Sequence, residues 1–294
     1  MSIAPAPQIS VLTPTWNRAE YLQQVWEALT RQSQKDFEWI VANDGSTDDT
    51  ISCVRSLAAN CEFPVTLISA SCRIGKSRMD NEAVSIARGK FIVWCDSDDY
   101  FLPSALEIII SSIKEYSGKK CFLFGVKIKN KNRLIKNFPP DKLQSNFIAL
   151  RADFGLKNDF KEVVETSLLK RCLYDVSFGC KRVPTYLLWS RVAEESDCLT
   201  FSAAVAFKEY LPGGMTDRGL QLKTTYSLPM AELYELLSRS RRYNSRFYRW
   251  RSRLLWVRYA LHSKTVKFKA WWMPLVLPVA VCLYCFDRYQ LKKQ

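Results

Sequence analysis

The sequence predicts an α/β protein with a mostly parallel central sheet and helices on both faces. Apolar runs that suit buried strands alternate with segments of helical spacing over residues 9–116. The run at 91–95 has five apolar residues, and three carboxylates follow within four positions. Polar loops follow two earlier runs. Because the carboxyl ends of parallel strands meet at one edge, where such sheets bind ligands, these loops predict a site there.

Each element has a local signal. Strands are expected at 9–13, 37–42, 64–68 and 91–95, and helices at 21–29, 48–59, 76–87 and 103–116. Pro14 ends the first strand, and the apolar residues of the first helix recur at steps of three and four. Gly89 ends the third helix. This alternation favours right-handed crossovers between parallel strands.

The acidic segment is Asp96-Ser97-Asp98-Asp99. Carboxylates two residues apart on an extended segment point to the same side, so Asp96 and Asp98 are placed to share one divalent cation. Mg²⁺ takes only one or two protein carboxylates and leaves its other positions to water and phosphates. The alternative is a helix start, in which an acid is the N-cap and Pro103 lies in the first turn.

Two further loops, 14–18 and 43–48, are expected at the same edge. Asp44 is suited to accept a hydrogen bond from a nucleobase or a ribose, and Trp16 to stack on a base. Lys76 and Arg78 are suited to phosphate oxygens. Each has an alternative: Asp44 as a turn residue, Trp16 as core, and the two basic side chains as solvated surface. No glycine-rich dinucleotide or P-loop motif occurs.

The charge and the cysteine and histidine content of the chain exclude some kinds of function. The formal charge is +14, and residues 239–294 carry 14 Lys and Arg against one acid, which predicts a basic segment that meets a polyanion. The ten cysteines form no paired CxxC clusters, so a zinc site is not expected. The cysteines are expected to be reduced thiols. The only histidine is His262, which argues against a His base. No secretory signal opens the chain.

The first 105 residues resemble family 2 glycosyltransferases of the GT-A fold. Four motifs carry the resemblance in order: 11–18, 43–48, the run from Gly75 through Asn81 to 87–92, and the DXD-like 96–99. The resemblance implies an inverting, metal-dependent transfer of a sugar from a nucleotide-diphosphate donor, most simply a UDP-sugar. The implied donor-binding residues are Thr13, Pro14, Trp16, Asn17, Asp44, Lys76, Asn81, Asp96 and Ser97.

The same resemblance implies that Asp98, with Asp96, ligates Mn²⁺ or Mg²⁺ bridging the diphosphate. The general base is harder to assign. A subgroup of the family has a Pro-Glu pair four residues before a Trp, and here Thr185 stands at the Glu position. A threonine hydroxyl is no base near neutral pH. Glu194 and Glu195 are the nearest acids, and other options are Asp159, Glu162 and Asp175. The loop 211–217 resembles the family's flexible lid.

The C-terminal segment is basic and aromatic. One helical stripe is expected from Leu236, Tyr243, Phe247, Trp250, Leu254, Val257 and Leu261. Residues 270–286 are uncharged and mostly apolar but contain two prolines, which favours an in-plane or re-entrant anchor over a full span. An anionic membrane surface contacted through 239–286 is therefore expected. The alternative for the stripe is a helix docked on the catalytic domain. An RNA-binding tail would not explain the apolar run, so no nucleic acid is expected.

We expect a GT-A domain over 1–225, with a nucleotide-sugar half at 8–105 and an acceptor half at 106–225, and a membrane-associating segment over 226–294. The protein is expected at the cytoplasmic face of the inner membrane, acting on a lipid-linked or glycan acceptor. Three alternatives stay open: transfer directly to polyprenyl phosphate, a non-catalytic nucleotide-sugar-binding subunit, and a membrane or RNA tether.

Overall fold

The computed structural model describes residues 5–128, 133–134, 138–156, 159–176, 181–208, 219–266 and 270–292. The predicted lid at 211–217 lies outside these residues. By compactness the chain divides into two units, each treated by itself. The first comprises Met1–Ser145, Leu156–Lys181 and Glu195–Glu209, and the second Asn146–Gly155, Arg182–Glu194 and Tyr210–Gln294. The domain boundary expected at residue 225 stays a prediction, because compactness alone does not define a domain.

The first unit is built on a sheet whose described strands run in the order β3-β2-β1-β4-β9-β6-β10-β5. Their bounds are β1 Ile9–Thr15, β2 Phe37–Asn43, β3 Val65–Ser69, β4 Phe91–Trp94, β5 Tyr100–Phe101, β6 Cys121–Ile128, β9 Lys161–Glu165 and β10 Cys198–Lys208. Short strands β7 (Arg133–Leu134) and β8 (Gln144–Ser145) pair with β6 and β10. The four predicted strands are all present.

The direction of the strands differs between the two halves of the sheet. Neighbours among β3, β2, β1 and β4 are parallel. However, β9 is antiparallel to both β4 and β6, and β5 is antiparallel to β10. The prediction of a mostly parallel sheet is therefore confirmed only for the first half. Strand–helix alternation stops after the helix near residue 110, so the local pattern did not indicate the direction of later strands.

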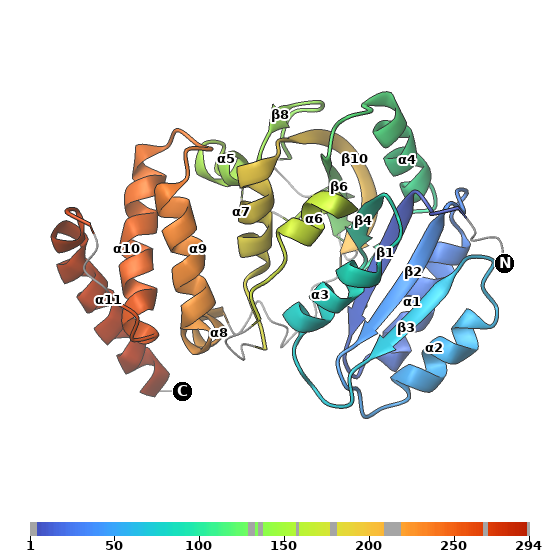
Figure 1. The fold of residues 1–294 in the computed structure, drawn as a ribbon, viewed down its shortest axis with the longest axis horizontal. Coiled ribbons are helices and arrows are strands. Elements are labelled where there is room, and N and C mark those ends of the chain that lie inside the picture. Colours follow the sequence, from blue (N-terminus) through green and yellow to red (C-terminus); the bar gives the residue numbers. More distant parts are fainter. Residues whose placement is uncertain are drawn as a thin grey trace. The chain divides into compact units, whose positions relative to one another are not determined.

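Helices cover both faces of the parallel half (Figure 1). The helices of the first unit are α1 Ala19–Thr30, α2 Thr50–Ala58, α3 Lys76–Ile86, α4 Ala105–Glu115 and α6 Thr166–Arg171. Of these, α4 contacts β10, and α6 contacts β9 and α3. Leu22 of α1, Val54 of α2 and Ile109 of α4 pack with Val11 and Trp39 in one apolar core. The opposite face of β1 and β2 contacts α3. These layers bury β1 and β2 along their whole length and β4 up to its last residue, as their continuous apolar sequences predict, whereas the edge strand β3 is partly exposed.

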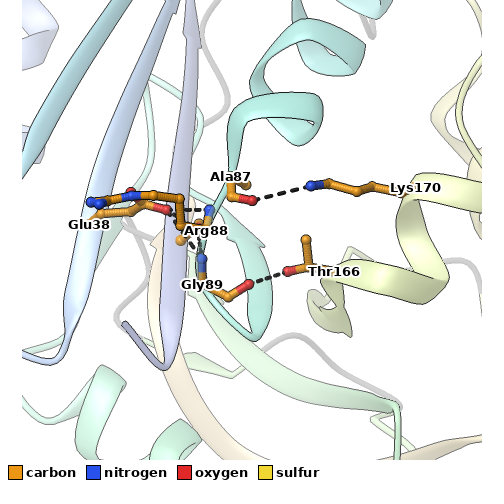
Figure 2. Close-up of polar contacts among 7 residues, drawn as sticks. Glu38, Ala87, Arg88, Gly89, Thr166 and Lys170 are labelled. Atoms are coloured by element: carbon orange, nitrogen blue, oxygen red, sulfur yellow. Dashed lines mark hydrogen bonds and ion pairs between the residues drawn. The ribbon is translucent and has the colours of Figure 1, made fainter. Parts of the chain in front are cut away.

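The turn from α3 into β4 is held by a buried carboxylate (Figure 2). Glu38 of β2 accepts hydrogen bonds from the Ser10 hydroxyl at 2.6 Å, from the Arg88 amide at 2.7 Å and from the Arg88 Nε at 3.0 Å. Thr166 of α6 donates to the Gly89 carbonyl. A Cβ on Gly89 would lie 2.4 Å from the Ser10 nitrogen, so only glycine fits there. These contacts define where β4 begins.

The second unit is helical. Its helices are α5 Phe147–Ala152, α7 Thr185–Glu195 (whose last residue belongs to the first unit), α8 Gly219–Thr225, α9 Ser227–Arg239, α10 Arg246–His262 and α11 Met273–Lys292. α10 packs against α9 and α11, with Met230, Trp256, Tyr259 and Val276 in their shared core.

The expected single stripe from Leu236 to Leu261 is wrong. Leu236 belongs to α9, and α10 begins only at Arg246 after the Ser245 hydroxyl caps the Tyr248 amide. Tyr243 and Val257 are buried within the unit. The apolar residues do recur with helical spacing, but most of them pack against other helices of the unit.

Candidate active site

The acidic segment forms a tight turn directly after β4. The Asp99 amide donates to the Asp96 carbonyl at 2.9 Å, and the chain then enters β5. Helix α4 begins only at Ala105 with Ser104 at its N-cap, so none of the three acids caps it. The alternative of a helix start is therefore wrong. Asp96 and Asp98 lie at the edge where the parallel strands end.

The carboxylates of the turn differ in their charged neighbours. Lys76 Nζ lies 3.4 Å from Asp96 Oδ1 and 3.1 Å from Asp80 Oδ2. Burial alone would raise the pKa of Asp96, but the Lys76 ammonium holds it well below its usual range. Among the described residues, the ion-pair partner of Asp98 is Arg18, whose Nη1 lies 3.7 Å from Asp98 Oδ2. Burial, followed by repulsion from Asp96 and Asp99, raises the pKa of Asp98.

Lys161 fixes the third acid of the turn. Its ammonium lies 2.9 Å from Asp99 Oδ2, and both side chains are buried, at 6% and 2% exposure. Lys161 is the first residue of β9, so this pair ties the acidic turn to the centre of the sheet. On the last residue of β10, Lys208 pairs with Asp159 at 3.6 Å. The fields of Asp99, Asp159 and Asp96 raise the pKa of Lys208 against the opposing effect of burial.

Asp44 connects two of the predicted loops. Its Oδ1 accepts hydrogen bonds from the Ile74 and Gly75 amides, both at 2.7 Å. Gly75 has φ +106, and a Cβ there would lie 2.1 Å from the Lys181 carbonyl oxygen, so the conformation requires glycine. The second oxygen, Oδ2, lies 3.8 Å from Arg73 Nε. Asp44 thus accepts two structural hydrogen bonds on one oxygen and has a charged neighbour at the other.

Trp16 is covered by a side chain that sequence reasoning missed. The Arg73 guanidinium lies 3.6 Å from the centroid of the Trp16 ring, and Trp16 is 39% exposed. Stacking of a planar cation on an indole is favourable, and a nucleobase would use the same kind of surface. Arg73 therefore marks an aromatic-stacking position beside Asp44.

Several predicted donor-binding residues make bonds inside the protein. Thr13 is fully buried and accepts from Trp39 Nε1 at 2.9 Å. Asn17 has φ +50, and its Oδ1 accepts from the Thr47 amide at 2.8 Å, which joins the first two loops. The Asn81 side chain bonds the main chain of Tyr174 through both its oxygen and its nitrogen. Their assignment to the donor stays a prediction, and the described contacts are those of a scaffold.

The remaining predicted donor residues differ in exposure. Pro14 and Ser97 are buried, Ser97 at 9% exposure, whereas Lys76 and Asp96 are partly exposed beside each other. Arg78 donates to the Val176 carbonyl at 3.2 Å. Lys76 and Asp96 thus offer charged groups at the sheet edge, while Ser97 lies within the turn.

The oxygen atoms at this edge of the sheet suit a hard divalent cation. Asp96 and Asp98 supply carboxylate oxygens, which Mg²⁺ and Mn²⁺ prefer, and the crowded negative charge on Asp98 favours a cation there. Among the described residues, no group of three or more His, Cys, Asp or Glu side chains is arranged to hold a metal. Two carboxylates are enough for a cation that takes its other ligands from diphosphate oxygens and water.

The carboxylates predicted as the general base are paired with basic side chains or exposed to solvent. Glu195 Oε2 accepts from Arg171 Nη2 at 2.8 Å and Nε at 3.0 Å. Glu194 and Asp175 are exposed, and Asp159 pairs with Lys208. Thr185 is the first residue of α7. The base stays unassigned by these contacts alone.

Glu162 differs from the other acids. It lies on β9 opposite Leu123, and continuing the register from the Val93–Val163 pair places it opposite Trp94. Residues directly opposite in an antiparallel pair share a face, so Glu162 and Trp94 face the same side of the sheet. The Trp94 Nε1 donates to Asp80, the partner of Lys76. Burial raises the pKa of Glu162 to about 7.

Four residues at this edge were not predicted: Arg73, Asp80, Lys161 and Lys208. Asp80 had a usable signal, because it lies four residues after Lys76 on a predicted helix and therefore on the same face. Lys161 and Lys208 had none, since each reaches the site from a distant strand.

Comparison with known proteins gives one family. The model of "Glycosyl transferase family 2" matches residues 10–156. A Campylobacter jejuni GalNAc(5)-diNAcBac-PP-undecaprenol beta-1,3-glucosyltransferase is 27% identical over 175 residues, which cover 58% of this chain and 56% of that protein. A Pasteurella multocida chondroitin synthase is 33% identical over 115 residues, 39% of this chain and 12% of that protein. The chain thus spans about half, or much less, of these relatives.

Solved structures share the fold. Staphylococcus aureus TarS 1-349 in complex with UDP has a TM-score of 0.62 at 17% identity, over 88% of this chain and 72% of that chain. The Pyrobaculum calidifontis mannosyltransferase PcManGT, in complex with GDP-Man and Mn2+, has a TM-score of 0.59 at 14% identity, over 98% and 83%. At these identities, the likeness concerns the fold alone.

Proposed function

Because the chain belongs to glycosyl transferase family 2, we propose that it transfers a sugar from a nucleoside-diphosphate donor to the hydroxyl group of a lipid-linked or glycan acceptor. The observation that carries the proposal is the acidic turn after β4. Asp96 and Asp98 lie there with excess negative charge, beside Lys76 and Arg18 and the loops that end β1 and β2. This edge combines cation ligands with cationic groups for phosphate.

UDP is the favoured nucleotide, since TarS has been crystallised with UDP and with UDP-GlcNAc. Lys76 and Arg18 are the proposed contacts for diphosphate oxygens. Asp44 Oδ2 and the Trp16 ring are the proposed contacts for the base, in which case the Arg73 guanidinium moves aside or stacks with it.

The proposed cofactor is Mn²⁺ or Mg²⁺ held by Asp98 and Asp96. When bound, the ion supplies Lewis-acid stabilisation of the charge that develops on the leaving diphosphate. The carboxylates of this chain hold it at the edge of the sheet, and Lys161 keeps Asp99, and with it the turn, in place. Lys76 orients the Asp96 carboxylate.

We propose Glu162 as the general base, in place of Glu194 or Glu195. In a single inverting displacement, the acceptor oxygen forms a bond to the anomeric carbon, the bond from that carbon to the diphosphate breaks, and the acceptor proton passes to Glu162. A carboxyl group with a pKa near 7 is matched to this task at neutral pH. Thr185, at the position where a subgroup of the family has Glu, cannot take the proton.

The acceptor is proposed to be lipid-linked. The C. jejuni relative carries undecaprenol in its name, and residues 239–294 of this chain are strongly basic. No helix among the described residues is long and apolar enough to cross a membrane. We therefore propose peripheral association of the helical unit with the cytoplasmic face of the inner membrane.

The first test measures nucleotide binding by thermal shift. UDP, GDP, CDP and dTDP are each added with Mn²⁺, Mg²⁺ or EDTA to the wild type, to Asp98→Ala and to Glu62→Ala, an exposed acid remote from the acidic turn. A ligand that binds only the folded state adds ~2.7 kcal/mol at a hundredfold excess over its Kd. We expect a metal-dependent UDP shift that Asp98→Ala abolishes and Glu62→Ala retains. No shift with any nucleotide would refute the proposal.

The second test concerns the base. We expect Glu162→Gln to lower kcat ~10²–10⁴-fold with little change in KM. The base must be ionised, so wild-type kcat/KM should rise with pH through about 7, and this limb should vanish in Glu162→Gln. Glu194→Gln and Glu195→Gln serve as matched controls. Loss of activity in either control, with Glu162→Gln active, would reassign the base. Nucleotide binding without turnover in the wild type would indicate a non-catalytic subunit.

A further inference from the structure

Helix α11 is apolar on two opposite faces, and its own unit covers only one. Its inner face presents Met273, Val276, Ala280 and Asp287, all buried at 8% exposure or less. Met273, Val276 and Ala280 share a core with Trp256 and Tyr259 of α10. These positions recur at steps of three, four and seven residues, so they lie on one side of the helix.

The outer face of α11 is solvent-exposed and without charge. It consists of Trp271, just before the helix, and Leu275, Val279, Cys282, Phe286 and Tyr289, at steps of four, four, three, four and three. Trp271 is 77% exposed and Leu275 63%. A helix that is apolar all round is normally buried all round, and a contiguous apolar face of this length marks a contact surface.

The charge distribution identifies the partner. The only acid of residues 239–294 is Asp287, which is fully buried. It accepts from Arg258 Nε at 2.8 Å and lies 2.9 Å from His262 Nε2. Arg241, Arg246, Arg251 and Arg288 are exposed. The described surface of this segment therefore presents cations and no carboxylate, which suits anionic headgroups. A second copy would bring like charges together.

We propose that α11 docks in the plane of an anionic lipid bilayer through its outer face. This proposal rests on the membrane association proposed above and identifies the surface that makes the contact. The aromatic rings of Trp271 and Tyr289, at the two ends of the face, suit the headgroup level. The inner face stays on α10, held by the Asp287–Arg258 pair. Because α10 carries several arginines, α11 lies on the bilayer and does not cross it.

The two segments expected to meet the lipid differ in their exposed side chains. The sequence predicted membrane contact through 239–286, by the stripe and by an in-plane or re-entrant anchor at 270–286, but only Phe247 and Trp250 of the stripe are exposed, at 79% and 39%. On α11 the exposed apolar side chains form an unbroken line. The two helices therefore make different predictions for matched substitutions.

The test is co-sedimentation of the full chain with vesicles. Vesicles of phosphatidylglycerol mixed with phosphatidylcholine are compared with pure phosphatidylcholine, at low and high salt. The variants are Leu275→Gln/Phe286→Gln on α11, Phe247→Gln on α10, and Phe154→Gln as a matched control, because Phe154 and Phe286 are similarly exposed, at 51% and 55%. Thermal unfolding checks that each variant is folded.

We expect the wild type to bind the anionic vesicles, and less so at high salt. The α11 double variant should lose binding by roughly a hundredfold or more, since each buried Leu or Phe contributes about one to two powers of ten. Phe154→Gln and Phe247→Gln should bind nearly as the wild type. Absence of wild-type binding, or loss only in Phe247→Gln, would overturn the proposal.

Two further outcomes are informative. If light scattering shows a dimer that the α11 variant dissociates, the face is an interface between copies and the proposal is wrong. Asp98→Ala should bind vesicles as the wild type does, because the acidic turn lies in the other unit. Vesicle binding without any nucleotide-induced thermal shift would leave α11 docking intact and refute the proposed transferase function.

Discussion

The carboxylates at the two ends of β4 have opposite surroundings. At its amino end, Glu38 accepts hydrogen bonds from Ser10, Arg88 and Gly89, and the bonds from Ser10 and Arg88 lower its pKa against the effect of burial (Figure 2). At its carboxyl end, Asp96, Asp98 and Asp99 crowd together, and Asp98 has a raised pKa. Glu38 is surrounded by hydrogen-bond donors, whereas at the other end Asp96 and Asp99 are paired with lysines and Asp98 keeps a raised pKa.

This difference separates scaffold from site. A buried carboxylate with a full set of donors stabilises the fold and needs no ligand. A cluster of carboxylates that repel one another costs stability, and a cation relieves that cost. The residue type is the same at both ends, so only the surroundings distinguish the two roles. The contrast predicts that substitution of a carboxylate with buried partners, or of such a partner, changes stability, whereas substitution of Asp98 changes activity.

The largest expected effect is on activity, from Asp98→Asn. Asp98 is a proposed metal ligand, and loss of such a ligand would remove several kcal/mol of transition-state stabilisation, so we expect kcat/KM to fall ~10³-fold. The free energy of unfolding should stay constant or rise slightly, because a repulsive charge is removed. Nucleotide release and urea unfolding measure the two quantities, with Glu62→Gln as the control. Strong destabilisation by Asp98→Asn would erase the contrast.

The second effect is on stability, from Lys161→Met. Removing one partner of a buried ion pair leaves Asp99 uncompensated, and we expect a loss of ~3 kcal/mol in urea unfolding. Lys114→Met, an exposed lysine on α4, should change stability by less than ~0.5 kcal/mol. Adding Asp99→Asn to Lys161→Met should recover part of the loss. Equal stability of the two lysine variants would show that Lys161 does not anchor the turn.

The third effect is from Gly89→Ala. The new Cβ would lie 2.4 Å from the Ser10 nitrogen, so β1 and β4 must separate locally, at ~2 kcal/mol. Gly118→Ala is a useful comparison, because its Cβ meets open space and only its φ of +94 is strained. We expect Gly89→Ala to unfold at lower urea than Gly118→Ala while keeping wild-type kcat. A reversed order would mean that β4 tolerates the shift.

The smallest effect is pH-dependent, from Glu38→Gln. We expect a loss of ~1.5 kcal/mol near neutral pH, the contribution of hydrogen bonds to a charged group. A carboxyl whose pKa is lowered on folding stabilises the protein above its unfolded pKa of about 4.5, and this contribution disappears as pH falls through the lower folded pKa. The gap between wild type and variant should therefore narrow in acid. A constant gap would mean that the ionised form of Glu38 contributes nothing.

Much of the first half of the fold followed from the sequence. The runs at 9–13 and 91–95 are continuous apolar segments, and such segments form strands wherever both faces are covered. The acidic residues after β4 and the polar loops after β1 and β2 were expected at one edge, because parallel strands end together. The antiparallel β9 was not expected, since a strand's direction depends on how the chain returns to the sheet.

By itself, the sequence predicted the residues that are proposed to bind a cation and a nucleotide, and it determined the basic, apolar character of the C-terminal segment. Spacing and composition are local properties, and they were enough for both. Only the tertiary structure decided which of these groups are engaged. In the structure, Asn81 is hydrogen-bonded to Tyr174, and Arg73 stacks on Trp16. Lys161 pairs with Asp99, 62 residues away in the chain, and one face of α11 is exposed to solvent. These contacts join residues distant in the chain, and their energies depend on burial and charge that no local pattern carries.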